Sequence, residues 1–259
     1  LGDSRGIAVA LNNLGDVVLS QGDHARAAAL FTESLSLFRE LEDNRGISLL
    51  LTNLAEVACM QQQYTRAAAL CEEGLALARE LSDSWGMSAA LNTLGNVARA
   101  QGDLARARAL YQECLNLRRE LGDKTGIASL LTQLADIAGA QGDGEQAIAL
   151  YMESLALYRA AGERSGMAGC LEGMAAVSGA RGQPEHAAQL FGAAAALRAA
   201  GSAPPAPAGV TNEHAVAEAR AALGDEAFAA AWAAGQAAPL DRVLDHSADV
   251  AARSEFLAG

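Results

Sequence analysis

The sequence predicts an all-α fold, a right-handed α-solenoid of five helix-turn-helix repeats closed by a C-terminal helical cap. Three observations lead to this prediction. The chain repeats every 40 residues, without a gap, over residues 1–200. Hydrophobic residues make up 51% of the chain but aromatic residues only 4%, so Ala and Leu dominate and favour helices over strands. Apolar residues recur at three- and four-residue spacing, which is the period of an amphipathic helix.

The repeat is visible by direct alignment of five blocks. The blocks open on similar hexapeptides, which are LGDSRG, LEDNRG, LSDSWG, LGDKTG and AGERSG. The first and third blocks share 23 of 40 positions. A fixed period of this length indicates a repeat architecture, in which each unit buries its apolar face only against its neighbours. The expected repeats are 1–40, 41–80, 81–120, 121–160 and 161–200.

Two helices are expected in each block, joined by a tight turn. The first begins after an acidic N-cap residue, which is Asp3 in the first block. Gly22 suits the left-handed position that ends this helix, and Asp23 can cap the next one. The apolar positions expected in the first helix are Ile7, Leu11, Leu14, Val17 and Val18. Those expected in the second helix are Ala27, Leu30, Phe31, Leu35 and Phe38.

After the fifth block the pattern changes. Residues 201–212 (GSAPPAPAGVTN) are rich in Pro and Gly and are expected to form a linker. Residues 213–259 are expected to form the helical cap, because a terminal repeat needs a polar outer covering. Three short helical patterns are visible there, at 213–223, 225–235 and 239–254.

Two aromatic residues are expected to anchor this cap. Phe228 and Trp232 lie one helical turn apart, so their side chains share one face of a helix. We expect them to be buried against Leu190, Phe191 and Leu197 of the fifth repeat, or within the cap itself.

The recurring pattern L-x-x-L-G…G-D…A-x-x-x-[FY]-x-x-x-L resembles the tetratricopeptide repeat. Its 40-residue length is similar to the repeats of kinesin light chains and of bacterial sensor proteins. The resemblance implies that small residues such as Gly15 and Ala27 lie where the two helices of a hairpin cross. The second block departs from the pattern with Gln62-Gln63 in place of Gly-Asp. In the first block the pattern is carried by Leu11, Leu14, Gly15, Gly22, Ala27, Phe31 and Leu35.

A second resemblance concerns the end of the chain. The segments LFGAAAALR (190–198) and ARAALGDEAFAAAWAAGQ (219–236) are similar to the C-terminal region of bacterial signal-transduction (STAND-type) ATPases and LuxR-type transcriptional regulators. This resemblance implies that the chain is the sensor or interaction region of such a protein. The chain also begins at Leu1, in the middle of the pattern, which favours a fragment with its ATPase domain upstream.

Composition excludes several classes of partner. The 19 basic and 31 acidic residues give a net charge of −12, which argues against a protein that binds nucleic-acid phosphates. No stretch reaches the roughly 20 apolar residues of a membrane span, and no secretory signal is recognisable. The cysteines show no C-x-x-C spacing and favour a reducing, cytoplasmic location. They are Cys59, Cys71, Cys114 and Cys170.

No residue pattern indicates an enzyme. A phosphate-binding loop, G-x-x-x-x-G-K-[ST], is absent, and Lys124 stands at an expected helix start. The histidines fall in turns or in the tail, without the i,i+4 spacing of a metal site. We therefore expect no catalytic residue, no cofactor and no metal. The four histidines are His24, His186, His214 and His246.

The concave surface is the candidate site. By the tetratricopeptide pattern, the first helices line it, and their amide and hydroxyl groups can bind the backbone of an extended peptide. Three carboxylates make the expected groove acidic, with Arg99 alone opposing them, so a neutral or basic partner fits better than a carboxylate. The alternative is an acidic face that is only solvated. The expected groove residues are Asn12, Asp16, Thr52, Glu56, Asn92, Asn96, Arg99, Thr132 and Asp136.

Trp85 breaks the pattern of the repeats. It stands where the other blocks have Arg5, Arg45, Thr125 and Ser165. An aromatic residue there is either an exposed contact point or part of the local packing between repeats. We interpret it as local packing, because a single aromatic residue at a junction is more often buried there.

The function predicted from these observations is a non-enzymatic protein- or peptide-binding module. It would act as the sensor or interaction domain of a bacterial ATPase or regulator, with a peptide and the NTPase domain of the same protein as partners. Neither nucleic acid nor a membrane is expected as a partner. Two alternatives stay open: a pocket that senses a small molecule, and a scaffold that self-associates through its ends.

Overall fold

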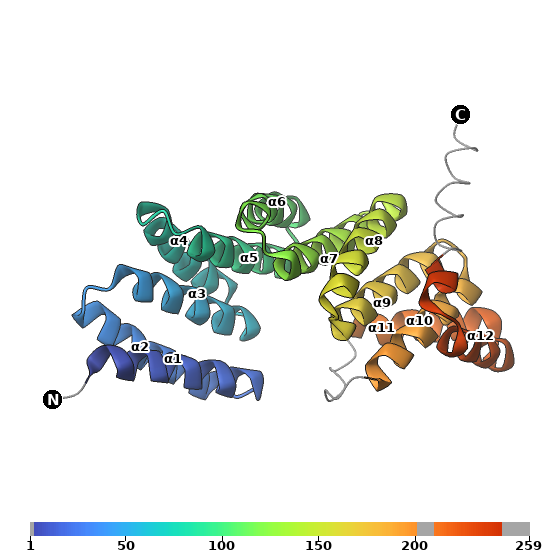
Figure 1. The fold of residues 1–259 in the computed structure, drawn as a ribbon, viewed down its shortest axis with the longest axis horizontal. Helices are drawn as coiled ribbons and strands as arrows, with labels where there is room; N and C mark the ends of the chain where they lie inside the picture. The colour runs from blue at the N-terminus through green and yellow to red at the C-terminus, as the bar shows by residue number, and fades with distance from the viewer. Residues whose placement is uncertain (1–2, 201–209, 245–259) are drawn as a thin grey trace. The chain divides into compact units, whose positions relative to one another are not determined.

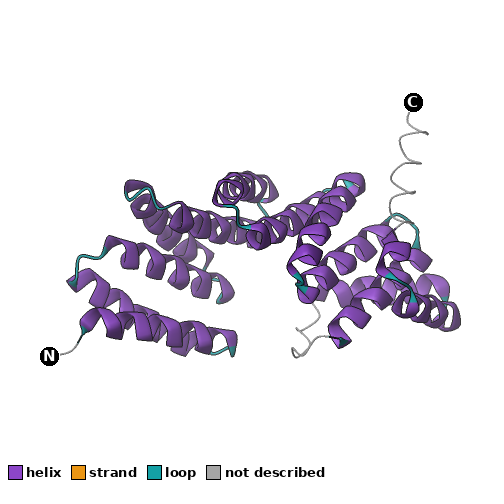
Figure 2. Cartoon of the chain, in the orientation of Figure 1, coloured by secondary structure: helices purple, strands orange, loops and turns teal. Residues whose placement is uncertain are grey.

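The structure is a computed structural model of the 259-residue chain, in which residues 3–200 and 210–244 are described. Helices joined by short turns make up these residues, and no strand occurs among them (Figure 2). Helices α1 to α12 follow one another along this part of the chain, and a further helical segment begins at residue 240 (Figure 1). The prediction of an all-α fold with repeated hairpins is confirmed.

The first ten helices form five hairpins, one in each 40-residue block. The three hairpins before residue 123 are α1 (Ser4–Ser20) with α2 (His24–Glu40), α3 (Asn44–Met60) with α4 (Tyr64–Glu80), and α5 (Ser84–Ala100) with α6 (Leu104–Leu121). The next two are α7 (Lys124–Ala140) with α8 (Gly144–Ala161), and α9 (Arg164–Ala180) with α10 (Pro184–Ala199). Two shorter helices follow, α11 (Val210–Leu223) and α12 (Asp225–Ala237).

The chain divides into two compact units, Leu1–Asp123 and Lys124–Gly259. In the first unit, α2 packs on α3, α4 packs on α5, and the first helices α3 and α5 also contact each other. In the second unit, α8 packs on α9, and α11 and α12 pack on α10. The domain boundaries expected from the sequence stay predictions, although α11 already begins at Val210, within the stretch expected to be a linker.

Aspartate residues start most of the hairpin helices, as predicted. The carboxylate of Asp3 accepts a hydrogen bond of 3.0 Å from the backbone N–H of Gly6, and Asp43 and Asp83 cap α3 and α5 in the same way. The second helices α2, α6 and α8 are capped by Asp23, Asp103 and Asp143. This capping satisfies N–H groups that a helix cannot pair internally, and it marks where the first three repeats begin.

Aromatic residues of the second helices pack into glycines of the first helices. A Cβ atom added at Gly15 would lie 2.4 Å from the Phe31 ring, and one added at Gly95 would lie 2.3 Å from the Tyr111 ring. Both rings are completely buried. The alanines at the expected crossing positions are also fully buried, namely Ala27, Ala67, Ala107, Ala147 and Ala187.

The cap is anchored largely as predicted. Phe228 is buried, and the ring of Trp232 stacks on that of Phe191 with 6.5 Å between the ring centres. Trp232 itself is only half-buried, so its expected burial is confirmed in part. Residues 240–244 are helical, and residues 245–254 of the third expected pattern lie outside the described residues.

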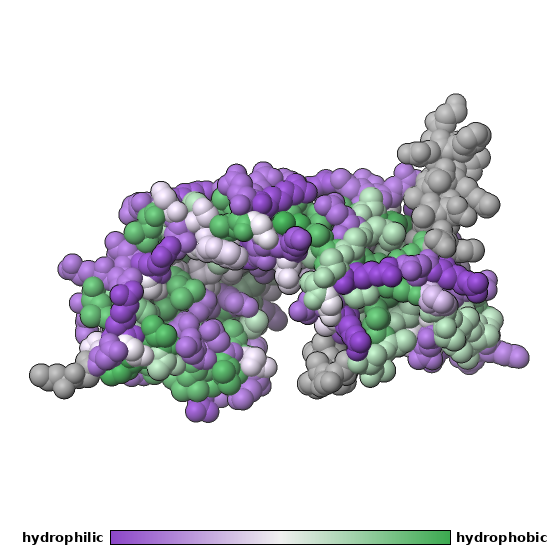
Figure 3. All heavy atoms as spheres, in the orientation of Figure 1, coloured by the Kyte–Doolittle hydropathy of each residue, from purple (hydrophilic) through white to green (hydrophobic). Residues whose placement is uncertain are grey.

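The expected core positions of α1 are partly wrong. Val18 is buried, but Ile7, Leu14 and Val17 are 48%, 45% and 53% exposed. Hydrophobic residues accordingly reach the surface over α1, at the lower left of Figure 3. The counterparts of Leu14 and Val17 in the next repeats are buried because a preceding hairpin covers them, and no described residue covers α1 in this way.

Candidate functional site

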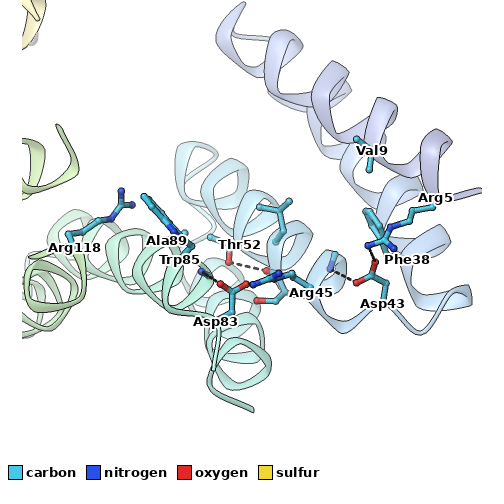
Figure 4. A pocket seen from close by; sticks show the side chains of 14 residues that line it. Arg5, Val9, Phe38, Asp43, Arg45, Thr52, Asp83, Trp85, Ala89 and Arg118 are labelled. Carbon is cyan, nitrogen blue, oxygen red and sulfur yellow. Dashed lines mark hydrogen bonds and ion pairs between the residues drawn. The ribbon is translucent and has the colours of Figure 1, made fainter. Parts of the chain in front are cut away.

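A cavity of about 620 Å³ opens in the first unit (Figure 4). Its walls come mainly from the first half of α1, α3 and α5, with Phe38 of α2 and Arg118 of α6 at its sides. The cavity therefore runs along the first helices of three successive repeats. These are the helices on which the sequence predicts a binding surface.

An exposed apolar row forms part of this wall. Val9 and Leu49 occupy the same position in successive repeats and are 45% and 46% exposed. Ala89 continues the row in the third repeat, and Trp85 lies one turn before it with 54% of its surface exposed. Large apolar side chains gathered at the surface of a hollow indicate an interaction site rather than an ordinary solvated face.

Two ion pairs connect successive repeats along the edge of the cavity. Arg5 Nη2 lies 2.9 Å from Asp43 Oδ2, and Arg45 Nε lies 2.8 Å from Asp83 Oδ2. The hydrogen bond from Arg45 lowers the pKa of Asp83 below its ordinary value. Both guanidinium groups remain largely exposed, so the pairs add little stability, but they hold the two arginine side chains beside the cavity.

Trp85 interrupts this series of ion pairs. It occupies the position of Arg5 and Arg45 in the third repeat, so no arginine there can reach the next aspartate, Asp123. Arg118 of α6 pairs with Asp123 instead, and its guanidinium lies over the Trp85 ring at 5.5 Å from the ring centre. The structure corrects the expectation of buried local packing, because Trp85 is half-exposed and lines the cavity.

Two of the predicted groove carboxylates lie close enough to influence each other. Partial burial raises the pKa of Asp16. The pKa of Glu56 is raised as well. The larger cause is the partial burial of its carboxylate, and the smaller cause is the negative charge of Asp16. Arg99 lies near this pair, since its charge acts on the neighbouring Cys59 thiol. The structure therefore forms an acidic cluster on α1 and α3.

The predicted amide and hydroxyl residues are less accessible than expected. Asn12 is only 8% exposed, and its side-chain oxygen accepts a 2.9 Å hydrogen bond from Asn53. Thr52 is buried as well, although it borders the cavity. Asn92 and Asn96 are half-buried, and the oxygen of Asn96 accepts a 2.7 Å hydrogen bond from the Tyr111 hydroxyl.

The remaining two predicted residues belong to the second unit. The hydroxyl of Thr132 hydrogen-bonds with that of Ser154 at 2.8 Å. Asp136 is exposed and accepts a 2.5 Å hydrogen bond from the Tyr151 hydroxyl. Tyr111 bonds to Asn96 in the same register of its own repeat, so these two hairpins share one arrangement of a tyrosine with a polar residue of the first helix.

Sequence reasoning missed the cavity residues at the fifth and ninth positions of the repeat. The sequence did contain a signal for the fifth-position residues. Arg5 and Arg45 occupy the same position of successive repeats, and Asp43 and Asp83 occupy another shared position, which suggests repeated ion pairs. The signal for the second group was weak, since Val9 and Leu49 read as two more apolar residues of an amphipathic helix.

A metal site, a membrane span and a reactive thiol each have requirements against which the described residues can be compared. Within residues 3–200 and 210–244, no group of three or more His, Cys, Asp or Glu side chains could hold a metal ion. None of the helices in these ranges is long and apolar enough to cross a membrane. All four cysteines are free thiols, and burial raises the pKa of Cys71 to about 12, which makes it unreactive.

Solved structures show where else this fold occurs. BtubC (BKLC) from P. vanneervenii is 21% identical, with a TM-score of 0.66 over 79% of this chain and 85% of its own. Aspartyl phosphate phosphatase F from Bacillus subtilis is 13% identical, with a TM-score of 0.69 over 91% of this chain and 60% of its own. A Rap protein in complex with Competence and Sporulation Factor is 14% identical, with a TM-score of 0.65 over 94% of this chain and 75% of its own. These likenesses concern the fold alone.

Family models identify the repeats directly. One model of the tetratricopeptide repeat matches residues 46–120, and a second matches residues 7–42 and 127–161. Together these ranges make up more than half of the chain. No curated protein sequence matches it. The matched ranges coincide with the first four hairpins of the structure, and the chain belongs to the tetratricopeptide repeat family.

Proposed function

We propose that the chain is a non-enzymatic module that binds an extended peptide segment of a partner protein along the first helices. The observation that carries this proposal is the cavity of about 620 Å³ with the exposed apolar residues Val9, Leu49 and Trp85 in its wall. A hollow with apolar side chains and a few fixed polar groups suits a ligand that buries an apolar side chain. The Rap protein with its bound factor supports the proposal, since it combines a similar fold with ligand binding.

Each part of the surface has a distinct role in this proposal. An apolar side chain of the peptide packs between Leu49 and Trp85, and Arg5 and Arg45 donate hydrogen bonds to backbone carbonyl groups at the cavity edge. Asn92 donates to the same backbone. Asn12, Thr52 and Asn96 support the wall through hydrogen bonds within the protein.

The acidic cluster determines which peptides bind best. Asp16 and Glu56 place two carboxylates on two of the cavity helices, α1 and α3, with Arg99 as the opposing charge. Such a cluster attracts a neutral or basic segment and disfavours an acidic one, and salt weakens this preference. Thr132 and Asp136 hold the corresponding positions in the second unit, and we propose them as groove residues of that unit by itself.

The module would serve as the sensor or interaction region of a bacterial signal-transduction ATPase or transcriptional regulator. The similarity of residues 190–198 and 219–236 to the C-terminal region of such proteins supports this assignment. Peptide binding would then favour one state of the NTPase domain, provided that the two states contact the module differently. The four free cysteines fit the cytoplasmic location that this role requires.

Peptide titrations test the proposal. Two fluorescent nonapeptides share the same central Leu and Phe residues, and they carry either three Arg or three Asp residues at the remaining positions. Fluorescence anisotropy at low and high salt measures their affinities for the chain, for Glu56→Lys and for Leu49→Asp. The matched control is Glu33→Lys, which reverses an exposed charge on α2 away from the cavity.

We expect the Arg peptide to bind more tightly than the Asp peptide, and the difference to shrink at high salt. Glu56→Lys should weaken binding of the Arg peptide, Leu49→Asp should weaken binding of both peptides, and Glu33→Lys should change neither affinity. A preference for the Asp peptide, or equal effects of Glu56→Lys and Glu33→Lys, would remove the acidic cluster from the function. Binding that Leu49→Asp leaves unchanged would exclude the cavity.

A further inference from the structure

The second helix of the second repeat, α4, is held by smaller side chains than its counterparts. At one position of the repeat, α2 and α6 bury the rings of Phe31 and Tyr111, whereas α4 buries the thiol of Cys71. Further along the same helices, α2 buries Phe38 and α4 buries Ala78. Aromatic side chains contribute most to the packing of a core because they bury the largest apolar surface. The packing of α4 on its neighbours therefore stabilises it less than these rings stabilise α2 and α6.

The two ends of α4 also lack local features that stabilise α6. The N-cap residue Gln63 accepts no side-chain hydrogen bond from the first turn, whereas an aspartate caps α6. The turns before and after α4 hold Gln62 and Ser82 in the left-handed region, with φ of 61° and 51°. The corresponding turns around α6 contain Gly102 and Gly122, which adopt this conformation without strain. Local opening of α4 would therefore relieve strain at both of its ends.

The neighbours of α4 are helices that form the cavity. Within the first unit, α4 packs on α3 and on α5 (Figure 1). Leu49 of α3 and Trp85 of α5 lie in the cavity wall. The packing of α4 on both helices therefore helps to set how far apart these two side chains lie.

We propose that α4 opens locally while α6 stays folded, and that a peptide bound between Leu49 and Trp85 holds α4 closed. The opening follows from the free chain alone, whereas the effect of the peptide rests on the proposed function. Opening of α4 breaks fewer large apolar contacts than opening of α6 and releases two strained turns, so the open form is more populated. A peptide that contacts both α3 and α5 binds the closed form more tightly and shifts the population toward it.

Thiol labelling tests the opening. Cys71 in α4 and Cys114 in α6 are both completely buried, and burial raises the pKa of both thiols, so each reacts with iodoacetamide only when its helix opens. Mass spectrometry of peptide digests measures the two labelling rates. Each rate is divided by that of the same thiol in the chain unfolded in guanidinium chloride. We expect the normalised rate of Cys71 to exceed that of Cys114 by at least about tenfold. Equal normalised rates, or a faster Cys114, would overturn the proposal.

Exchanging the turns tests the cause of the opening. Gln62→Gly together with Gln63→Asp gives α4 the Gly-Asp turn that precedes α6. This variant should slow the labelling of Cys71 at least about fivefold and leave Cys114 unchanged. The matched reciprocal control, Gly102→Gln with Asp103→Gln, should accelerate the labelling of Cys114 and leave Cys71 unchanged.

Circular dichroism shows whether both variants keep the helical content of the parent chain. If the reciprocal variant loses it, the first variant decides the result, since the first variant removes strain. An unchanged rate at Cys71, or an equal change at both thiols, would mean that the turns do not control a local opening of α4 and would overturn the proposal.

Hydrogen exchange gives a second measurement that needs no thiol. The backbone amides of α4 (Tyr64–Glu80) should exchange faster than those of α6 (Leu104–Leu121), each relative to the unfolded chain. Equal or greater protection of α4 would contradict the local opening.

The Arg-containing nonapeptide of the titrations tests the effect of a ligand. At about ten times its dissociation constant, it should slow the labelling of Cys71 by about three- to tenfold and affect Cys114 less. A peptide that binds by anisotropy but leaves the rate at Cys71 unchanged overturns this coupling. If no peptide binds, the proposed function fails and the coupling with it, while the labelling rates of the free chain still decide whether α4 opens.

Discussion

Single residues show how the repeat tolerates departures from its own pattern. Gly22, Gly102 and Gly142 hold the left-handed position in the turn within their hairpins, with φ of 83°, 80° and 82°. In the second hairpin Gln62 holds this position with φ of 61°. The turn geometry is therefore determined by the stacking of the repeats and not by the glycine alone, and Gln62 is strained in it.

Replacing Gln62 by Gly should stabilise the chain. A left-handed conformation costs a residue with a Cβ atom about 1–2 kcal/mol, and the greater freedom of Gly in the unfolded chain offsets part of that gain. We expect the free energy of unfolding to rise by about 0.5–1 kcal/mol in urea denaturation. The reverse change, Gly102→Gln, should lower it by a similar amount. If Gln62→Gly lowers the free energy of unfolding, or Gly102→Gln raises it, the turn is not strained.

The acidic cluster should make stability depend on pH. The pKa of Glu56 is raised in the folded chain by partial burial and by Asp16, so the folded state favours its protonated form. Folded stability therefore decreases as the pH rises from the ordinary Glu value, about 4.3, through the raised value. Glu56→Gln removes this cost and should stabilise the chain at neutral pH, by less than about 1 kcal/mol because solvent screens the charge.

Thermal melts at pH about 7 and about 4 measure this effect, since the raised pKa keeps the Glu56 carboxyl group mainly protonated at the lower value. The stabilising difference should disappear at the lower pH. The control is Glu33→Gln, an exposed change on α2 that should have little effect at either pH. An equal gain from Glu56→Gln at both values would assign the effect to something other than charge.

At the scale of helices, most of the fold could be predicted from the sequence because local rules and the repeat agree. Asp3 and Gly22 mark the two ends of α1, and their counterparts mark most of the other hairpin helices. The candidate site was harder to predict. Whether Val9 is buried or exposed depends on which face a neighbouring helix covers, and the pairing of Arg118 with Asp123 depends on a contact that only the folded hairpin creates.

The crossing of the two helices in a hairpin should not tolerate a larger residue. Ala107 is fully buried at this crossing in the third repeat. Ala107→Leu adds three carbon atoms to a packed site and should lower the free energy of unfolding by about 1–3 kcal/mol. The exposed change Arg26→Gln should cost less than about 0.5 kcal/mol. If the two variants melt at the same temperature, the register of the repeat is wrong.

The contact between α10 and α12 should be more sensitive still. A Cβ atom at Gly235 would lie 1.9 Å from the backbone oxygen of Gln189, and a backbone cannot move aside as a side chain can. We expect Gly235→Ala to release α12 and to expose Trp232, which a red shift of tryptophan fluorescence would report. Gly169→Ala is the matched control, because it meets no atom within 4 Å and should gain about 0.5–1 kcal/mol from helix propensity. A stable Gly235→Ala variant with unchanged fluorescence would contradict this helix contact.

For the molecule as a whole, the two ends of the repeat array are treated differently. The fifth hairpin is sealed by α11 and α12, which add Phe228 to its core. The first hairpin presents Ile7, Leu14 and Val17 to the surface. In a solenoid each repeat contacts only its nearest neighbours, so the covering of the fifth hairpin comes from the helices that directly follow it.

Because each repeat contacts mainly its neighbours, we predict that the first unit folds alone. Two of its buried clusters, one around Phe31 and Leu51 and one around Ala67 and Val97, lie within residues 1–123. A chain of residues 1–123 should therefore show a cooperative thermal transition and the far-ultraviolet ellipticity per residue of a helical protein. A chain of residues 1–100 is the control, because it loses α6 and with it the Tyr111 ring that packs against Gly95, and it should melt at a lower temperature. An unfolded 1–123 chain, or equal melting of the two chains, would mean that the first unit depends on the rest of the molecule for its stability.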